Sequence, residues 1–333
     1  MKLSSPPTRY AFTSVIAATM KYGPTRVSRI AYELDMPVET CRYYLKRFHN
    51  AGFRFLPVVD YKALGLQPCI LFIRFSKKLD PVKRKNFLRW LDTVYVVYRT
   101  ALGNELEYYI ETVPPKGDVS VLKKMMEMLL DVGVLENFNL SEIVDGYYRP
   151  EWIRLYDFTK NCWSEAIELD IPKILISRTD RISNFDQLDL QLISYLEENP
   201  TVKMIDISQK LSIPPQLISY HRERHVDGGR LITGYVPYRR TRHEDFRIQI
   251  IATHRQEPIT DYLHYAISTG DNIRYLRAHI PVNIELSLEY AHPFTVNPMD
   301  IVRFTVPVEH FSDKKWTKLS VFTETLEKII GIV

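Results

Sequence analysis

The sequence predicts an α+β fold with two winged helix-turn-helix domains, each followed by a ferredoxin-like domain. Residues 29–52 and 206–229, which start 177 positions apart, show the same helix-turn-helix pattern without a gap. The segment after the first copy has the order strand, helix, strand, strand, helix, strand, which is that of the ferredoxin-like arrangement. A gapless run of matches between two distant stretches indicates two copies of one structural unit.

The repeat consists of identical residues at identical spacing. Its matched pairs are Leu34 and Leu211, Pro37 and Pro214, Tyr43 and Tyr220, Arg47 and Arg224, and Gly52 and Gly229. The chain has 333 residues, which is enough for two to four compact domains. The predicted segments are a winged helix-turn-helix at 1–62, a ferredoxin-like effector or dimerisation domain at 63–150, a packed connector at 151–185, a second winged helix-turn-helix at 186–243 and a second, irregular ferredoxin-like domain at 244–333.

Apolar spacing and turn residues predict the elements of the first unit. These are three helices and the strand of a wing, at 10–22, 27–34, 38–50 and 53–59. Gly23-Pro24 ends the first helix, and Thr25 can cap the second. The third helix carries an apolar stripe, and Ala51-Gly52 ends it in a left-handed cap.

The remaining elements follow from the same patterns. The second unit repeats three helices and a wing strand at 188–196, 205–211, 215–226 and 231–238. The first mixed segment has strands at 68–76, 94–102, 105–112 and 135–148 and helices at 80–92 and 119–132. The second mixed segment repeats the first four elements, strand, helix, strand and strand, at 246–253, 259–267, 273–280 and 284–290. It ends with an extra strand at 301–308 and a terminal helix at 314–330. Trp152, Trp163 and Pro172 make the connector too apolar for a flexible tether.

Composition limits the class of protein. The chain is 45% hydrophobic and 25% charged, which is ordinary for a soluble globular protein. No apolar run reaches the roughly 18 residues of a membrane span, and the N-terminus lacks the apolar core of a signal peptide. Cys41, Cys69 and Cys162 are odd in number and widely spaced, which argues against a disulfide framework and a zinc site. We therefore expect a soluble, cytoplasmic protein.

Positive charge is concentrated in the first unit. The chain has a net charge of +4, whereas residues 1–62 hold ten Lys or Arg against four Asp or Glu, a balance of about +6. Residues 186–243 hold eight against seven. A locally basic domain on a near-neutral protein is typical of nucleic-acid binding, and a basic solvated face is the alternative interpretation.

One face of the third helix carries the candidate DNA contacts of the first unit. The residues that project from this face are Glu39, Thr40, Arg42, Tyr43 and Lys46. The N-terminal part of such a helix enters the major groove, where arginine can donate two hydrogen bonds to guanine. Arg26, Arg47 and Arg54 are better placed to contact phosphates. A solvated amphipathic helix would have the same pattern.

The second unit has weaker candidates, because its charge is lower. The corresponding residues are Gln216, Ser219, Tyr220, Arg222 and Arg224. Arg239 and Arg240 belong to a basic run after the second wing, which either lies along phosphates or forms an exposed linker. We predict neither a metal nor another cofactor, since the histidines of this unit (His221, His225 and His243) lack metal-ligand geometry with cysteines or clustered carboxylates.

The layout resembles that of the feast/famine regulators, the Lrp/AsnC family. Residues 186–193, DQLDLQLI, resemble the family's opening LDxxDxxIL, and 228–235, GGRLITGY, resemble its exit from the helix-turn-helix. Residues 59–65, VDYKALG, resemble the bridge into the effector domain. The resemblance implies two tandem copies in one chain, which form internally the pair that the family makes by homodimerisation. Further homodimerisation stays open.

The family's Gly-x-x-Asp signature, near its amino-acid pocket, is not preserved. The chain has Gly103 and Leu106 at the first equivalent position and Pro281 and Ile284 at the second. A carboxylate is needed to hold the ammonium group of an amino acid. The sequence therefore does not predict an amino-acid effector.

Three functions remain. The leading hypothesis is a transcriptional regulator, not an enzyme, with double-stranded DNA as its partner. The second is a tetrapyrrole enzyme. Siroheme decarboxylases resemble tandem or paired feast/famine units whose winged helices have lost DNA binding, and these enzymes use His and Arg for tetrapyrrole carboxylates. The candidate residues for that role are His254, Arg255, Arg274, Arg277 and His279. The third is a protein-interaction module of the transcription machinery or chromatin.

Overall fold

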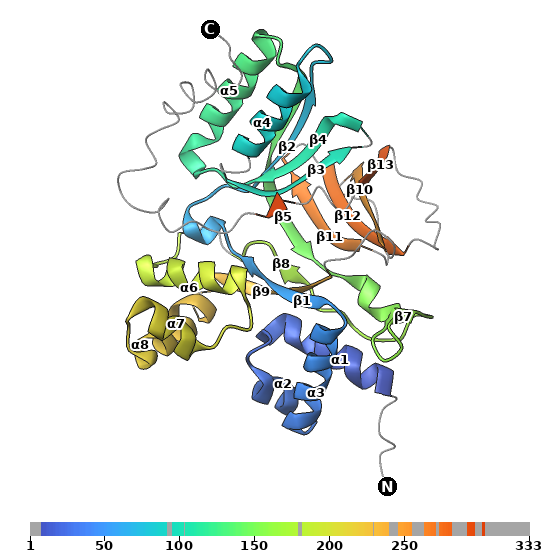
Figure 1. The fold of residues 1–333 in the computed structure, drawn as a ribbon, viewed down its shortest axis with the longest axis vertical. Helices are drawn as coiled ribbons and strands as arrows, with labels where there is room; N and C mark the ends of the chain where they lie inside the picture. The colour runs from blue at the N-terminus through green and yellow to red at the C-terminus, as the bar shows by residue number, and fades with distance from the viewer. Residues whose placement is uncertain are drawn as a thin grey trace.

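The two helical units and the large sheet lie at opposite ends of the molecule (Figure 1). The structure is a computed structural model that describes residues 8–91, 95–102, 104–178, 182–228, 230–239, 246–254, 263–270, 273–281, 292–296 and 302–303. Two three-helix units lie at one end, and a large sheet with two further helices lies at the other (Figure 1). The predicted α+β class is confirmed. Within the described ranges, no helix combines the length and apolar character that crossing a membrane requires.

The first helical unit follows the prediction closely. It contains α1 (Thr8–Tyr22), α2 (Val27–Glu33), α3 (Val38–Asn50), β1 (Phe53–Val59) and the short η1 (Lys62–Leu64). α3 has the predicted bounds, because its apolar stripe is buried and Gly52 turns the chain at a φ of +85°. The prediction that Thr25 caps α2 is wrong. Arg26 stands at the N-cap without a side-chain bond, since the turn after Gly23 continues through Thr25.

The second helical unit has the same order with one difference. It contains α6 (Gln187–Glu198), α7 (Met204–Leu211), α8 (Pro215–His221), the π-helical turn η4 (Arg222–Asp227) and β9 (Ile232–Arg239). The side chain of Asp186 accepts a hydrogen bond from the backbone N–H of Asp189. In return, the side chain of Asp189 accepts a hydrogen bond from the backbone N–H of Asp186. This capping box starts α6. The predicted helix 215–226 changes to π geometry after His221.

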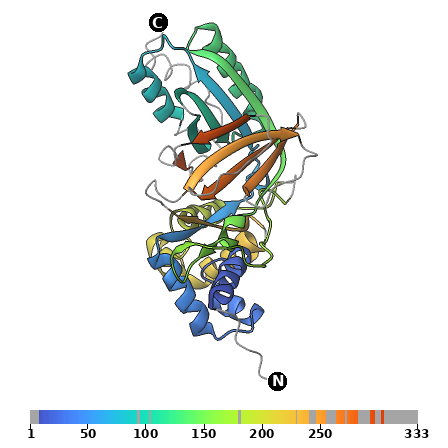
Figure 2. The same ribbon diagram turned by 90° about the vertical axis from the view of Figure 1, so that its right-hand side faces the viewer.

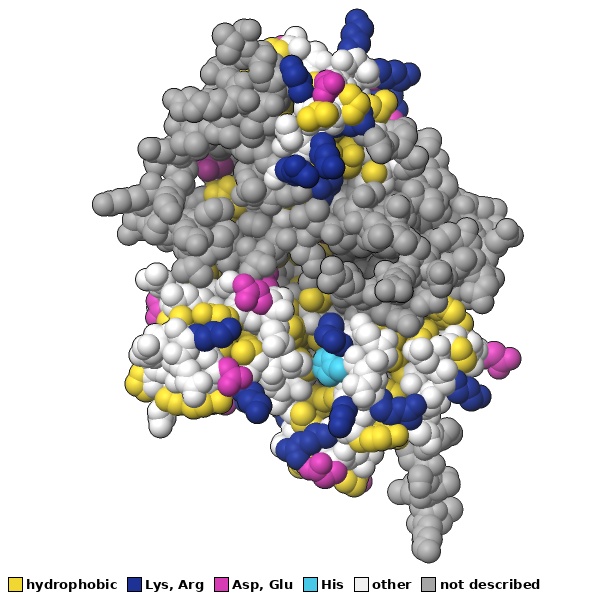
Figure 3. Space-filling view, in the orientation of Figure 1, with side chains coloured by type: hydrophobic (Ala, Val, Ile, Leu, Met, Phe, Trp, Pro, Cys, Tyr) yellow, Lys and Arg dark blue, Asp and Glu magenta, His cyan; other side chains and the backbone are white. Residues whose placement is uncertain are grey.

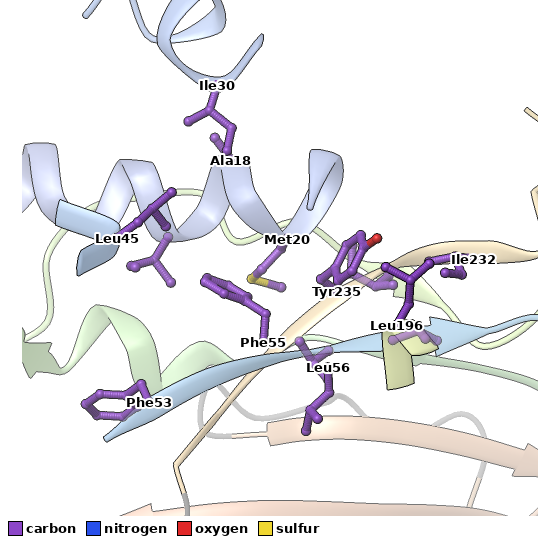
Figure 4. Close-up of a cluster of buried hydrophobic side chains, with 14 of the residues drawn as sticks. Ala18, Met20, Ile30, Leu45, Phe53, Phe55, Leu56, Leu196, Ile232 and Tyr235 are labelled. Atoms are coloured by element: carbon purple, nitrogen blue, oxygen red, sulfur yellow. The ribbon is translucent and has the colours of Figure 1, made fainter. Parts of the chain in front are cut away.

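The strands predicted as two wings pair with each other. β1 and β9 form an antiparallel two-stranded sheet, with Phe53 opposite Arg239 and Val58 opposite Gly234. Both helical units pack on this sheet and share one hydrophobic core. Figure 4 shows side chains of α1, α3, β1, α6 and β9 converging there, among them Met20, Phe55 and Tyr235. Because β1 and β9 pair with each other, neither strand is free to act as a wing.

The connector packs against the first unit through aromatic rings. It includes η3 (Glu151–Arg154), β6 (Tyr156–Asp157), β7 (Cys162–Trp163) and β8 (Ile174–Leu175). Trp152 stacks on Phe53 with ring centroids 5.8 Å apart, and Phe158 lies 5.3 Å from Phe12. Both connector rings are buried, so this segment is part of the core.

The first mixed segment builds half of the large sheet. Its elements are β2 (Cys69–Phe75), α4 (Pro81–Leu91), β3 (Val96–Leu102), β4 (Asn104–Thr112), η2 (Lys116–Asp118), α5 (Val119–Asp131) and β5 (Leu135–Tyr148), with strand order β5-β2-β4-β3. Leu71, Ile73 and Phe75 alternate along β2 and face the helices, where they join the buried residues of α4 and α5. The long β5 continues beyond this half toward the helical units (Figure 2).

The second mixed segment completes the same sheet. β10 (Phe246–His254), β11 (Leu263–Thr269), β12 (Ile273–Pro281) and β13 (His292–Val296) have the order β13-β10-β12-β11. β11 pairs with the second part of β5, and β14 (Val302–Arg303) pairs with β3. The predicted helix 259–267 is wrong from Leu263 onward, because these residues pair with strands on both sides. The elements predicted at 284–290 and 314–330 lie outside the described residues.

Candidate nucleic-acid interface

The outward face of α3 is open to solvent. Glu39, Arg42, Tyr43 and Lys46 are exposed, and Thr40 is half-buried, whereas the opposite face of the helix lies in the core. Figure 3 shows several Lys and Arg side chains over the part of the surface where α2 and α3 lie. The Arg42 guanidinium pairs with the Glu39 carboxylate one turn earlier. Exposed pairs of this kind contribute little free energy, so Arg42 can exchange partners.

Further exposed cations lie elsewhere in the first helical unit. Lys21 pairs with Glu33 at 3.5 Å, and the Arg29 guanidinium lies 4.5 Å from the centre of the Tyr22 ring. Arg54 is exposed, and its Nη1 donates to the backbone oxygens of His49 and Phe53 at 2.9 and 2.7 Å. These contacts use only part of each cation's hydrogen-bonding capacity, so phosphates can still bind there.

Arg26 and Arg47 have partners within the protein, and their predicted role at phosphates stays a prediction. Arg26 donates to Glu223 at 3.0 Å and to Asp227 at 3.1 Å, and so ties the two helical units together. Burial opposes its charge, but these two acids outweigh burial and raise the pKa of Arg26. Arg47 donates to the backbone oxygen of Thr159 in the connector at 2.8 Å.

The second unit presents fewer candidates than predicted. Gln216, Tyr220 and Arg224 are exposed, and Ser219 is half-buried. Arg222 is only 4% exposed, which corrects its predicted DNA contact. Its Nε pairs with Asp227 at 3.1 Å, and its Nη2 donates to the hydroxyl of Tyr235.

The two arginines of the predicted basic run are only partly covered by the structure. Arg239 ends β9 opposite Phe53, so its backbone belongs to the sheet between the units. Arg240 lies outside the described residues. The predicted path of this run along phosphates therefore stays a prediction.

A cleft of about 970 Å³ lies between the helical units and the connector. Its charged lining residues are Lys21, Arg26, Arg29, Lys173, Arg178, Glu223 and Asp227. Burial, aided by the charge of Arg230, lowers the pKa of Arg178. The excess of cations indicates a positive potential that attracts anionic groups to the junction.

Sequence reasoning missed one cluster of titratable side chains. Asp186, Asp189, His221 and His225 each place a ligand-type atom within 4.8 Å of the others. For His221 and His225, this corrects the expectation that the histidines of the second unit lack metal-ligand geometry with carboxylates; His243 lies outside the described residues. The spacing of the two histidines, four residues apart on one helix, was the available signal.

The tetrapyrrole candidates lie on β10 and β12. His254 pairs with Ile273, while Arg277 and His279 pair with Ile250 and Ile248. Directly opposed residues share a face of a sheet, and alternate residues along a strand do too. The register therefore places positions 254, 277 and 279 on one face and position 274 on the other, while Arg255 lies outside the described residues.

Comparison with known proteins gives likeness of fold only. No family model matches the chain, and no curated protein matches it. The siroheme decarboxylase NirDL matches with a TM-score of 0.51 and 10% identity, over 96% of this chain and 100% of that one. The structure of NirDL in complex with an iron-uroporphyrin III analogue matches with a TM-score of 0.53 and 11% identity, over 96% of this chain and 100% of that one. A transcriptional regulator from Neisseria meningitidis, solved with L-Met, matches 42% of this chain and 90% of its own at a TM-score of 0.32 and 16% identity.

The full-length matches change one prediction. We expected a protein without enzymatic activity, but the structures that match over the whole chain are those of an enzyme. The expectation that the protein is not an enzyme is therefore wrong, because proteins with this fold include an enzyme. AsnC-family regulators match about two fifths of the chain.

Proposed function

We propose that this protein is a transcriptional regulator that binds double-stranded DNA through the outward face of α3. The observation that carries the proposal is the exposure of Arg42, Tyr43 and Lys46 on a helix whose opposite face is buried. A helix of this kind fits the major groove with its polar face toward the base edges.

The exposed residues divide into two roles. Arg42 and Tyr43 lie in the first half of α3, where a recognition helix meets base edges. Lys46 and the exposed Arg29 and Arg54 are suited to phosphates, which set the position of the helix without reading sequence. When Arg42 donates to a guanine, its present partner Glu39 is released to solvent.

The pairing of β1 with β9 supports an internal pair of DNA-binding units. The strand that follows each three-helix unit contacts the equivalent strand of the other, and Arg26 adds ion pairs to η4. In this proposal, one chain holds two helix-turn-helix units in a fixed relation, which is what a two-part DNA site requires. The second unit would offer Gln216 and Arg224 from its exposed face.

The test is a titration of fluorescein-labelled duplexes at several salt concentrations, followed by fluorescence anisotropy. Each phosphate contact lowers the slope of log K against log salt concentration by about 0.9. Lys46→Ala is expected to remove about one such contact, and Arg42→Ala to cost about 1–3 kcal/mol on the preferred sequence only. Absent or salt-insensitive binding by the native chain would contradict the proposal.

A matched control separates local contact from net charge. The double variant Lys123→Ala/Lys124→Ala removes two exposed cations from α5, at the other end of the molecule. It changes the net charge as much as Arg42→Ala/Lys46→Ala does. If both double variants lose affinity equally, α3 is not the contact surface.

Binding of a carboxylated tetrapyrrole is the second candidate function. The full-length likeness to NirDL, which was also solved with an iron-uroporphyrin III analogue, favours it. The register places His254, Arg277 and His279 on one sheet face, and arginine pairs well with carboxylates. An absorbance titration with iron uroporphyrin tests this candidate. A shifted Soret band that Arg277→Ala weakens supports it, and an unchanged spectrum contradicts it.

A further inference from the structure

Two imidazole rings converge on one buried carboxylate at the junction of α6 and α8. His221 Nδ1 lies 2.9 Å from Asp189 Oδ1, and His225 Nδ1 lies 3.0 Å from Asp189 Oδ2. Asp186 adds an oxygen 3.7 Å from the same nitrogen of His221. Asp189 is fully buried, and the His221 ring is nearly so. Four potential ligands from two separate stretches of chain, 186–189 and 221–225, therefore meet at one point.

The charge of this group calls for a cation. Two carboxylates face two imidazoles, and within the described part of the chain neither Asp186 nor Asp189 forms an ion pair with a lysine or arginine. A buried carboxylate is costly unless it is paired with a positive charge or coordinates a metal. Protonated imidazole or a metal ion can supply that charge.

The ligand set and its spacing fit a metal of the zinc type. Two imidazole nitrogens with carboxylate oxygens are ligands that zinc accepts in tetrahedral sites. Bond lengths of about 2.0–2.1 Å put ligand atoms about 3.3 Å apart in a tetrahedron. His221 Nδ1 and Asp189 Oδ1, which are 2.9 Å apart, need to separate by only a few tenths of an ångström. The four ligand atoms lie within 4.8 Å of one another, so the more distant ones have to move closer as the ion binds. The 3.7 Å distance from Asp186 needs to shorten by a similar amount.

The local backbone supports the same conclusion. His221 ends α8, and His225 lies within the π-helical turn η4, with ring centroids 4.6 Å apart. π-Helical turns are rare and are frequently found at functional sites. Asp186 and Asp189 are fixed by the capping box of α6, so the carboxylates are held before any ion arrives.

We propose that Asp186, Asp189, His221 and His225 bind a divalent transition-metal ion of the zinc type. The metal replaces the hydrogen bonds from the two Nδ1 atoms, so each imidazole binds it as the neutral form with its proton on Nε2. The ion fixes α8 and η4 against the start of α6 within the second helical unit.

Metal binding is tested on the full chain, freed of any affinity tag, in a Cys162→Ser background that removes the exposed thiol. Isothermal titration with Zn²⁺ is expected to show one ion bound per chain. Co²⁺ is expected to give the intense visible absorption of a tetrahedral site. His221→Gln and His225→Gln are each expected to weaken Zn²⁺ binding by about 100-fold or more, since even residues outside the ligand set cost 10–100-fold.

Two further variants make the result specific. Asp186→Asn keeps an acceptor at the helix N-cap but removes the charge, and it is expected to weaken binding by about 10-fold or more. His49→Gln, which changes a histidine outside the cluster, is expected to bind Zn²⁺ as the parent does. Circular dichroism shows whether each variant is folded. Zn²⁺ binding that is absent from the folded parent, or equal in the parent and in a folded His221→Gln variant, overturns the proposal. Neither result depends on DNA binding.

Discussion

Replacing Asp227 with asparagine tests the structural role that we assign to Arg222. The Arg222 side chain is 5% exposed, and Asp227, at 3.1 Å, is its charged partner. Burial works against the charge of this guanidinium, but Tyr235 and Asp227 outweigh burial and raise the pKa of Arg222. Asp227→Asn leaves a buried cation without a counter-charge and also removes the ion pair between Asp227 and Arg26.

The magnitude follows from the burial of the two partners. Removing one partner of a buried ion pair costs about 3–5 kcal/mol. Asp227 is 30% exposed, and the Tyr235 hydroxyl still accepts a bond, so we expect the lower end, about 3 kcal/mol. Equilibrium unfolding in urea, followed by circular dichroism, measures this loss. Glu223→Gln removes an exposed partner of Arg26 and is expected to cost less than about 1 kcal/mol.

A double variant separates an unpaired charge from lost packing. Arg222→Met/Asp227→Asn removes both charges and keeps much of the arginine's volume. Because no buried charge is left unpaired, it is expected to be more stable than Asp227→Asn alone. Equal stability of Asp227→Asn and Glu223→Gln would refute the reasoning, because it would mean that Arg222 is solvated.

Three further predictions concern backbone, thiols and pH. Gly23→Ala at φ +83° brings a Cβ within 2.6 Å of the Tyr235 ring of β9, whereas the Cβ of Gly52→Ala at φ +85° has no neighbour within 4 Å. We expect Gly23→Ala to lower the free energy of unfolding in urea by about 2 kcal/mol more than Gly52→Ala does. Equal losses would count against the close approach. Burial raises the pKa of Cys69 to about 12, so at pH 8 a thiol reagent should modify exposed Cys162 rapidly and Cys69 only after unfolding, and rapid labelling of both contradicts this. Burial, aided by the nearby Arg54, lowers the pKa of His49 from 6.5. The unfolded chain therefore binds the proton more readily than the folded chain, so the free energy of unfolding falls as the pH drops below 6.5. His49→Gln is expected to make that fall less steep, and an unchanged pH dependence would contradict this.

Local patterns predicted the elements that local forces determine. The bounds of α3 and β5 agree with the prediction, because apolar periodicity and the turn at Gly52 are encoded within a few neighbouring residues. β11 was mistaken for the end of a helix. A short apolar segment such as 263–267 fits either element, and its pairing with β5 and β12 decides.

Long-range partners account for what the sequence did not reveal. Nothing near Phe53 indicates that β1 pairs with a strand about 180 residues away, so both strands were interpreted as wings. Arg26 and Arg222 have the polarity of surface residues, yet one bridges the units and the other is buried beside Tyr235. His221 and Asp189 are 32 positions apart, and only the packing of α8 on α6 brings them together.

Selection of bound duplexes from a random pool by the full chain tests the central claim most directly. We expect one enriched sequence motif, with protection of major-groove atoms that is lost in Arg42→Ala and retained in Lys123→Ala/Lys124→Ala. Enrichment of no motif, or a motif whose protection survives the loss of Arg42, would contradict the assignment of α3 as the recognition helix.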